Sequence, residues 1–106
     1  MNESRQLGRT ALEAEWLDLV RRRLPALADE RDWPIRLDHC FARVLLDNAV
    51  GGCWYDFISG RPAYRQASDA QLGEAVALGL AAEAGGFDLP AANARSLRWR
   101  GKEGAH

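Results

Sequence analysis

The sequence predicts an all-α fold: one helical domain of about four helices, with an irregular aromatic-rich insertion between the second and third helices. Apolar residues recur at helical spacing in several segments, whereas no segment alternates polar and apolar residues for long enough to form a strand. The chain has 106 residues, of which 47% are hydrophobic and 27% are charged, as is usual for a single globular domain. We expect that domain to span residues 1–106, with flexible ends at 1–9 and 101–106.

The first predicted helix covers residues 10–28. Its apolar side chains follow one another at intervals of three and four, which places them on one stripe of an amphipathic helix: Leu12, Trp16, Leu19, Val20, Leu24 and Leu27. Pro25 lies inside this pattern, where it has no backbone N–H to donate and crowds the preceding turn. The sequence therefore predicts a kink or a break near residues 22–24, followed by a charged connector over residues 29–32.

The second predicted helix covers residues 36–49 and ends at Gly51 and Gly52. At about 100° per residue, its core face is formed by Leu37, Phe41, Val44 and Leu45. The opposite face is polar and carries Arg36, His39, Arg43 and Asp47, with Cys40 at its edge. In the first turn, the Asp38 carboxylate is expected to accept a hydrogen bond from an exposed backbone N–H group.

An aromatic-rich insertion follows this helix. Residues 53–58 are compatible with one short helical turn that carries Trp54, Phe57 and Ile58 inward. Gly60 and Pro62 then mark a turn that ends it.

Two further helices complete the predicted domain. Ser68 and Gln71 have the spacing of a capping box, so a third helix begins there and runs to about residue 84. Its core positions are Leu72, Val76 and Leu80, and its many alanines and glycines allow another helix to approach closely, so we expect it to mediate a homo-oligomer. A last helix from Leu89 to about residue 99 has four candidate buried positions, which are Leu89, Ala92, Leu97 and Trp99.

Charge and hydropathy indicate which kinds of partner the protein binds and in which cellular compartment it is expected. Fourteen basic and 15 acidic residues give a formal net charge of −1, which does not favour binding to nucleic acid or to an anionic membrane. Basic clusters at residues 21–23 and 95–102 are typical of solvated helix faces, so nucleic-acid binding through the C-terminal helix ranks third among our hypotheses. No apolar run suits a membrane span or a secretion signal, so we expect a cytoplasmic protein with reduced Cys40 and Cys53.

Asp38, His39 and Cys40 are the three residue types used in thiol catalysis. Consecutive side chains diverge on a helix, however, which favours a capping Asp38, a surface His39 and a small buried Cys40. A transferase-type enzyme that uses His39 as acid/base or Cys40 as nucleophile remains the second functional hypothesis. The spacing indicates no metal site and no phosphate-binding glycine loop, so no cofactor is expected.

Arginines and aromatic residues in and around the insertion supply the first functional hypothesis. Guanidinium groups bind carboxylate or phosphate in a planar fork, and aromatic rings supply a wall. The same arginines are equally suited to internal pairs with Asp38, Asp47 or Asp56. We expect a small binding or regulatory module for an anionic ligand or a protein partner, with a site formed by Arg36, His39, Arg43, Asp47, Trp54, Tyr55, Arg61 and Tyr64.

The block W-P-I-R-L-D-H-C-F-A-R at residues 33–43, followed by L-D-N, W-Y-D and a final S-L-R-W-R-G-K, carries a family resemblance. Together these motifs extend over about two thirds of the chain, and they resemble a group of small uncharacterised bacterial and fungal proteins. Some members of that group are labelled acetyltransferase. The acetyltransferase fold needs a central sheet and a phosphate-binding turn, which this sequence does not predict, so the resemblance implies no catalytic residue here.

Overall fold

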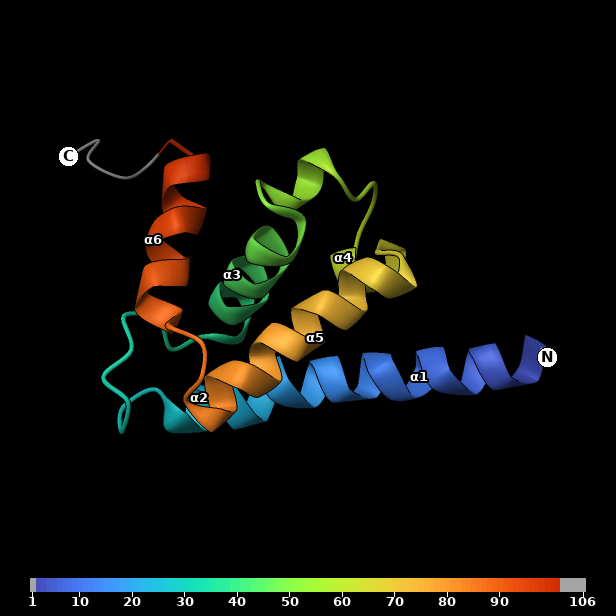
Figure 1. Ribbon diagram of the computed structural model, residues 1–106, viewed down its shortest axis with the longest axis horizontal. Coiled ribbons are helices and arrows are strands. Elements are labelled where there is room, and N and C mark those ends of the chain that lie inside the picture. Colours follow the sequence, from blue (N-terminus) through green and yellow to red (C-terminus); the bar gives the residue numbers. More distant parts are fainter. Residues whose placement is uncertain (1, 102–106) are drawn as a thin grey trace.

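The computed structural model describes residues 2–101, with side chains from residue 8 onward, and its regular structure in this range is entirely helical (Figure 1). This confirms the predicted all-α fold. The elements in chain order are α1 (Asn2–Asp18), the π-helical turn η1 (Leu19–Arg23), α2 (Leu24–Leu27), α3 (Asp38–Val50), the 3-10 turn η2 (Trp54–Asp56), α4 (Ala63–Gln66), α5 (Asp69–Ala84) and α6 (Leu89–Trp99). Of the ends expected to be flexible, residues 2–9 form the beginning of α1, whereas Met1 and residues 102–106 lie outside the described residues.

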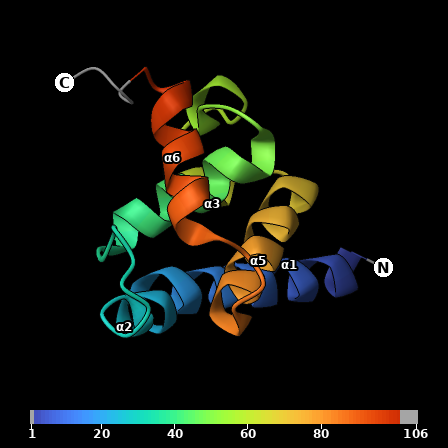
Figure 2. The same ribbon diagram turned by 60° about the vertical axis from the view of Figure 1, so that its left-hand side comes forward.

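Helix α3 occupies the middle of the structure. It packs against α5 on one side and against α6 on another, while α5 also crosses α1 (Figures 1 and 2). The molecule measures 50 × 30 × 20 Å, and α1 runs along its long dimension. The largest side chains that are almost completely buried come from these four helices and from η1 and α2, and they include Trp16, Leu19, Leu24, Phe41, Leu45, Leu72 and Leu89. Within the described range, no helix has both the length and the apolar character that crossing a bilayer requires.

Pro25 changes the form of the first helix without interrupting it. The N–H of Leu24 donates to the carbonyl of Leu19, five positions back, so the chain widens into η1 immediately before the proline. This arrangement relieves the crowding that a proline ring causes four residues upstream. Leu19, Val20 and Leu24 therefore remain buried on one side, and the irregularity predicted near residues 22–24 takes the form of a π-helical turn.

Helix α5 begins at the predicted capping box, with the Gln71 N–H 3.0 Å from Ser68 Oγ and the Ser68 N–H 2.8 Å from Gln71 Oε1. Its small residues serve packing within this chain. A Cβ atom on Gly79 would lie 3.1 Å from Leu19 Cδ1 and 3.2 Å from a Leu45 methyl group, so a larger side chain would push these helices apart. Leu80, which we predicted in the core, is 39% exposed.

The single core face predicted for α3 is wrong in two places. Leu37 precedes the helix in an extended conformation and is 59% exposed, whereas Asp47 is completely buried. The physical reason is that α3 packs against both α5 and α6, so residues on opposite sides of the helix are both buried. A helical wheel with one apolar and one polar face cannot represent a helix that is covered on two sides.

Two aromatic residues that we predicted inside lie at the surface. Phe57 is 54% exposed and its ring covers Gly52, where an added Cβ would come within 3.0 Å of it. Trp99 is 39% exposed at the end of α6, which packs chiefly on α3. Ile58 and Leu89 are buried as predicted.

Candidate functional site

Two adjoining pockets form a groove between α1, α3 and the insertion. The first, which we name the apolar pocket, has a volume of about 220 Å³. Its wall is mainly hydrocarbon and comes from Trp16, Leu17, Val20, Ala42, Leu46, Pro62, Ala63 and Tyr64. The polar members of its lining are Arg21, Asp38 and His39.

The second pocket, which we name the arginine pocket, has a volume of about 360 Å³. It contains three guanidinium groups and an imidazole, and its polar lining residues are His39, Arg43, Arg61 and Arg100, beside Trp54. No described aspartate or glutamate lines it. The two pockets meet along a strip that they share, which consists of His39, Ala42, Leu46 and Ala63.

Arg43 is held in place by neutral partners. Its Nη1 donates to Ser96 Oγ at 2.7 Å and its Nη2 donates to Asn93 Oδ1 at 2.8 Å, and both partners lie on α6. Arg61 lies over the ring of Trp54, with its Cζ atom 5.4 Å from the ring centroid. Within residues 8–101 neither arginine forms an ion pair with a carboxylate, and both line the pocket.

Arg100 differs because it binds a buried carboxylate. Its Nε and Nη2 donate to the two oxygens of Asp47 at 2.8 and 3.0 Å, and this hydrogen bonding raises the pKa of Arg100. Asp47 also accepts from Ser96 Oγ at 2.7 Å and from the Trp54 backbone N–H at 2.9 Å. Asp47 was predicted on the polar surface of this helix, but it is completely buried. Its hydrogen bonds hold Arg100 and the start of η2 in place.

The other predicted site residues are divided between the groove and its surroundings. Tyr64 lines the apolar pocket. Arg36 is exposed and pairs with Asp29 in the connector, outside both pockets. Tyr55 lines neither pocket; its ring centroid lies 5.2 Å from Arg100 Cζ, and a hydrogen bond with Cys53 raises the pKa of its phenol.

The candidates for thiol catalysis do not converge. His39 has a 75% exposed side chain with Nδ1 3.6 Å from Asp38 Oδ1, while Cys40 packs against the hydrophobic core and lines neither pocket. Asp38 accepts a hydrogen bond from the His39 backbone N–H at 2.7 Å, as predicted for the first turn of this helix. Cys40 and Cys53 are both free thiols. In the described part of the chain, no three His, Cys, Asp or Glu side chains come together in a way that would hold a metal ion.

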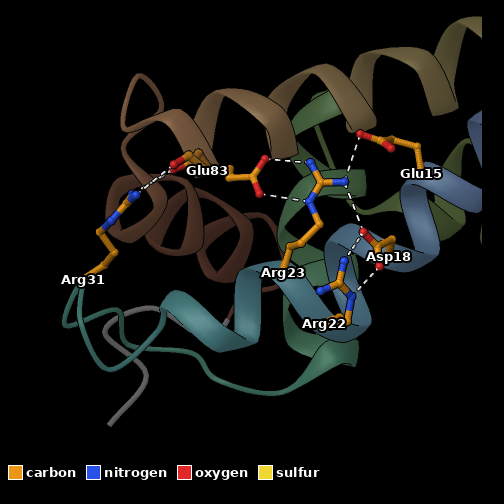
Figure 3. Close-up of polar contacts among 7 residues, drawn as sticks. Glu15, Asp18, Arg22, Arg23, Arg31 and Glu83 are labelled. Atoms are coloured by element: carbon orange, nitrogen blue, oxygen red, sulfur yellow. Dashed lines mark hydrogen bonds and ion pairs between the residues drawn. The ribbon is translucent and has the colours of Figure 1, made fainter.

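A second group of charges, at the contact between η1 and α5, was not anticipated from the sequence (Figure 3). Arg23 donates to both oxygens of Glu83 at 2.9 and 2.7 Å, and also to Glu15 and Asp18. These contacts lower the pKa of Glu83, chiefly through the hydrogen bond from Arg23, and the pKa of Asp18, chiefly through Arg22. Arg31 donates to the carbonyls of Ala82 and Glu83 and so caps the end of α5. The residues of this group join helices and line no pocket. Their neighbour Arg21 lines the apolar pocket.

Comparison with other proteins adds no functional information. No family model matches the chain, and no curated protein or solved structure shows significant similarity to it. Arguments about function therefore rest on the groove itself.

Proposed function

We propose that this chain is a small binding module that holds an anionic small molecule in the arginine pocket. The observation that carries the proposal is that Arg43 and Arg61 face this pocket without a carboxylate partner among the described residues. Arg100 and His39 lie in the same lining. An anion bound here would meet an excess of positive charge on a protein whose formal net charge is only −1.

The arginines are also oriented before any ligand arrives. Ser96 is completely buried and Asn93 is half-buried, so the hydrogen bonds that they accept hold Arg43 in one position. Arg61 lies over the ring of Trp54, with its Cζ atom 5.4 Å from the ring centroid, so a cation–π interaction favours this position of the guanidinium. Ordering these side chains in advance lowers the entropy cost of binding, so that a charge-assisted hydrogen bond to a carboxylate or phosphate contributes more to affinity.

Titration calorimetry at low ionic strength, with inorganic phosphate and citrate as probes, tests this proposal. We expect Arg43→Ala and Arg61→Ala each to weaken binding of the better probe by about tenfold, since each removes a hydrogen bond to a charged group. Arg36→Ala is the matched control because it also removes one positive charge, from a residue that precedes α3 and lines neither pocket. Equal losses in all three variants would mean that only net charge matters, and absence of binding by the wild type would contradict the proposal outright.

The enzyme hypothesis has partial support from the groove. His39 lines both pockets and is placed to act as an acid or base on a bound molecule, whereas Cys40 lies outside them. Homo-oligomer formation through α5 has less support, because Ala75, Gly79 and Ala82 are buried within the chain. A protein partner that presents an acidic side chain to the arginine pocket would be recognised by the same chemistry.

A further inference from the structure

The two pockets of the groove differ in chemistry but are continuous. They share His39, Ala42, Leu46 and Ala63, so a molecule in one pocket has a direct path into the other. Ala42 comes from α3 and Ala63 from α4, and the side chain of each is a single methyl group. The passage is lined by the two alanine methyl groups and by the larger side chains of His39 and Leu46.

The apolar pocket is suited to hydrocarbon. Trp16, Val20 and Leu46 are buried core residues that turn part of their surface toward it, and Leu17 and Tyr64 are half-buried there. Its polar members are one cation, Arg21, one carboxylate, Asp38, and the imidazole of His39, which it shares with the arginine pocket, so this pocket has no excess of charge comparable to that of the arginine pocket. An apolar group that enters it leaves water without displacing strong polar contacts.

We infer that the ligand is an amphiphilic anion, specifically a medium-chain carboxylate, whose head lies in the arginine pocket and whose chain extends past Ala42 and Ala63 into the apolar pocket. This inference rests on the proposed anion-binding function and adds the class of ligand. Charge complementarity sets the orientation, since Arg43 and Arg61 attract the carboxylate and the Trp16 side of the groove offers no such excess. A small inorganic anion would occupy only half of the groove.

A series of carboxylates measured by titration calorimetry tests the inference. From acetate through butanoate and hexanoate to octanoate, we expect the dissociation constant to fall by about tenfold for every two added methylenes, until the chain fills the apolar pocket. Octanol supplies the same chain without the charge and should bind much more weakly than octanoate. Arg43→Ala should remove most of the difference between octanoate and octanol.

Variants of residues in the passage distinguish the contribution of the ligand's hydrocarbon chain to affinity from that of its carboxylate head. Ala42→Leu and Ala63→Leu narrow it from opposite walls, and because both alanines also border the arginine pocket, each should weaken octanoate binding by at least tenfold more than it weakens acetate or phosphate binding. Two variants are used so that a folding defect in one, detected by circular dichroism, leaves the other informative. Ala77→Leu is the control, because Ala77 is exposed on α5 outside the groove.

The outcomes distinguish the two proposals. If all carboxylates and phosphate bind equally and depend on Arg43, the anion site stands and the amphiphilic ligand is wrong. If octanol equals octanoate and Arg43→Ala changes neither, the groove is a neutral apolar site and both proposals fail. If phosphate or citrate binds and no member of the series does, the inference of a chain in the apolar pocket is overturned.

Discussion

Arg100 and Arg23 each join helices that are distant in sequence, but they do so in opposite surroundings. The carboxylate of Asp47 is completely buried and receives hydrogen bonds from Arg100, Ser96 and the Trp54 backbone. The carboxylates around Arg23 keep 34–38% of their side-chain surface in water. Removal of one partner therefore leaves a charge stranded away from water in one place, whereas solvent can replace the lost partner in the other.

The buried pair gives the largest expected effect. Arg100→Ala removes both charged donors from Asp47 and leaves a buried carboxylate with two neutral donors. We expect a loss of about 3–5 kcal/mol in the free energy of unfolding, because an unpaired charge must be kept away from water. Urea denaturation followed by far-UV circular dichroism measures it.

The double variant Asp47→Asn with Arg100→Met is the control for this prediction. It removes both charges, so no ion is stranded, and it should be more stable than Arg100→Ala alone. A double variant as unstable as the single one would show that packing around Arg100, and not the stranded charge, determines the loss.

The exposed group gives a smaller effect. Arg23→Ala breaks contacts with Glu83, Glu15 and Asp18 at once, and we expect it to cost about 1 kcal/mol at low salt. High salt should reduce this loss, since the carboxylates are accessible to screening ions. The cost of Arg100→Ala should change much less with salt.

Its neighbour provides a matched control. Arg22 pairs only with Asp18 within the described residues, one helical turn away, and its side chain is 73% exposed. Arg22→Ala should leave the urea midpoint unchanged within error. A loss equal to that of Arg23→Ala would mean that the basic cluster acts through net charge and not through the contact between η1 and α5.

The contrast also explains what the sequence could and could not predict. Local signals succeeded: the helical spacing, the capping box at Ser68 and the disturbance caused by Pro25 all depend on residues within a few positions of one another. The burial of Asp47 was missed because its partner Arg100 is 53 residues away, and no local pattern marks that pairing.

The candidate site was predicted in part for the same reason. His39, Arg43, Trp54 and Arg61, which we grouped from the sequence, all line the arginine pocket, because the aromatic insertion follows α3 directly and folds back beside it. Arg36 was grouped with them from a helical wheel that extended the helix too far toward its start, since α3 begins at Asp38. Arg100 and Trp16 come from remote elements, and only the packing of α6 and α1 brings them to the groove.

The smallest expected effect is a pH dependence of the free energy of unfolding that arises from Glu83, in the exposed group around Arg23. The pKa of Glu83 lies below its ordinary value of 4.5, chiefly because of the hydrogen bond from Arg23. The unfolded chain therefore binds more protons at this residue than the folded one, so the Glu83 contribution is fully present above about pH 4.5 and is lost as the pH falls through the lowered pKa. The difference in unfolding free energy between wild type and Glu83→Gln should shrink over that window.

Glu74→Gln is the appropriate comparison, because Glu74 is exposed on the same helix and forms no ion pair within residues 8–101. A Glu74→Gln difference that shrank as much as the Glu83→Gln difference would mean that the contacts of Arg23 are not the cause. If instead the Glu83→Gln difference were flat and acid unfolding were unchanged, the Arg23 contacts would contribute nothing in solution. The stability of the contact between η1 and α5 would then come from apolar packing, such as that of Leu19 on Gly79.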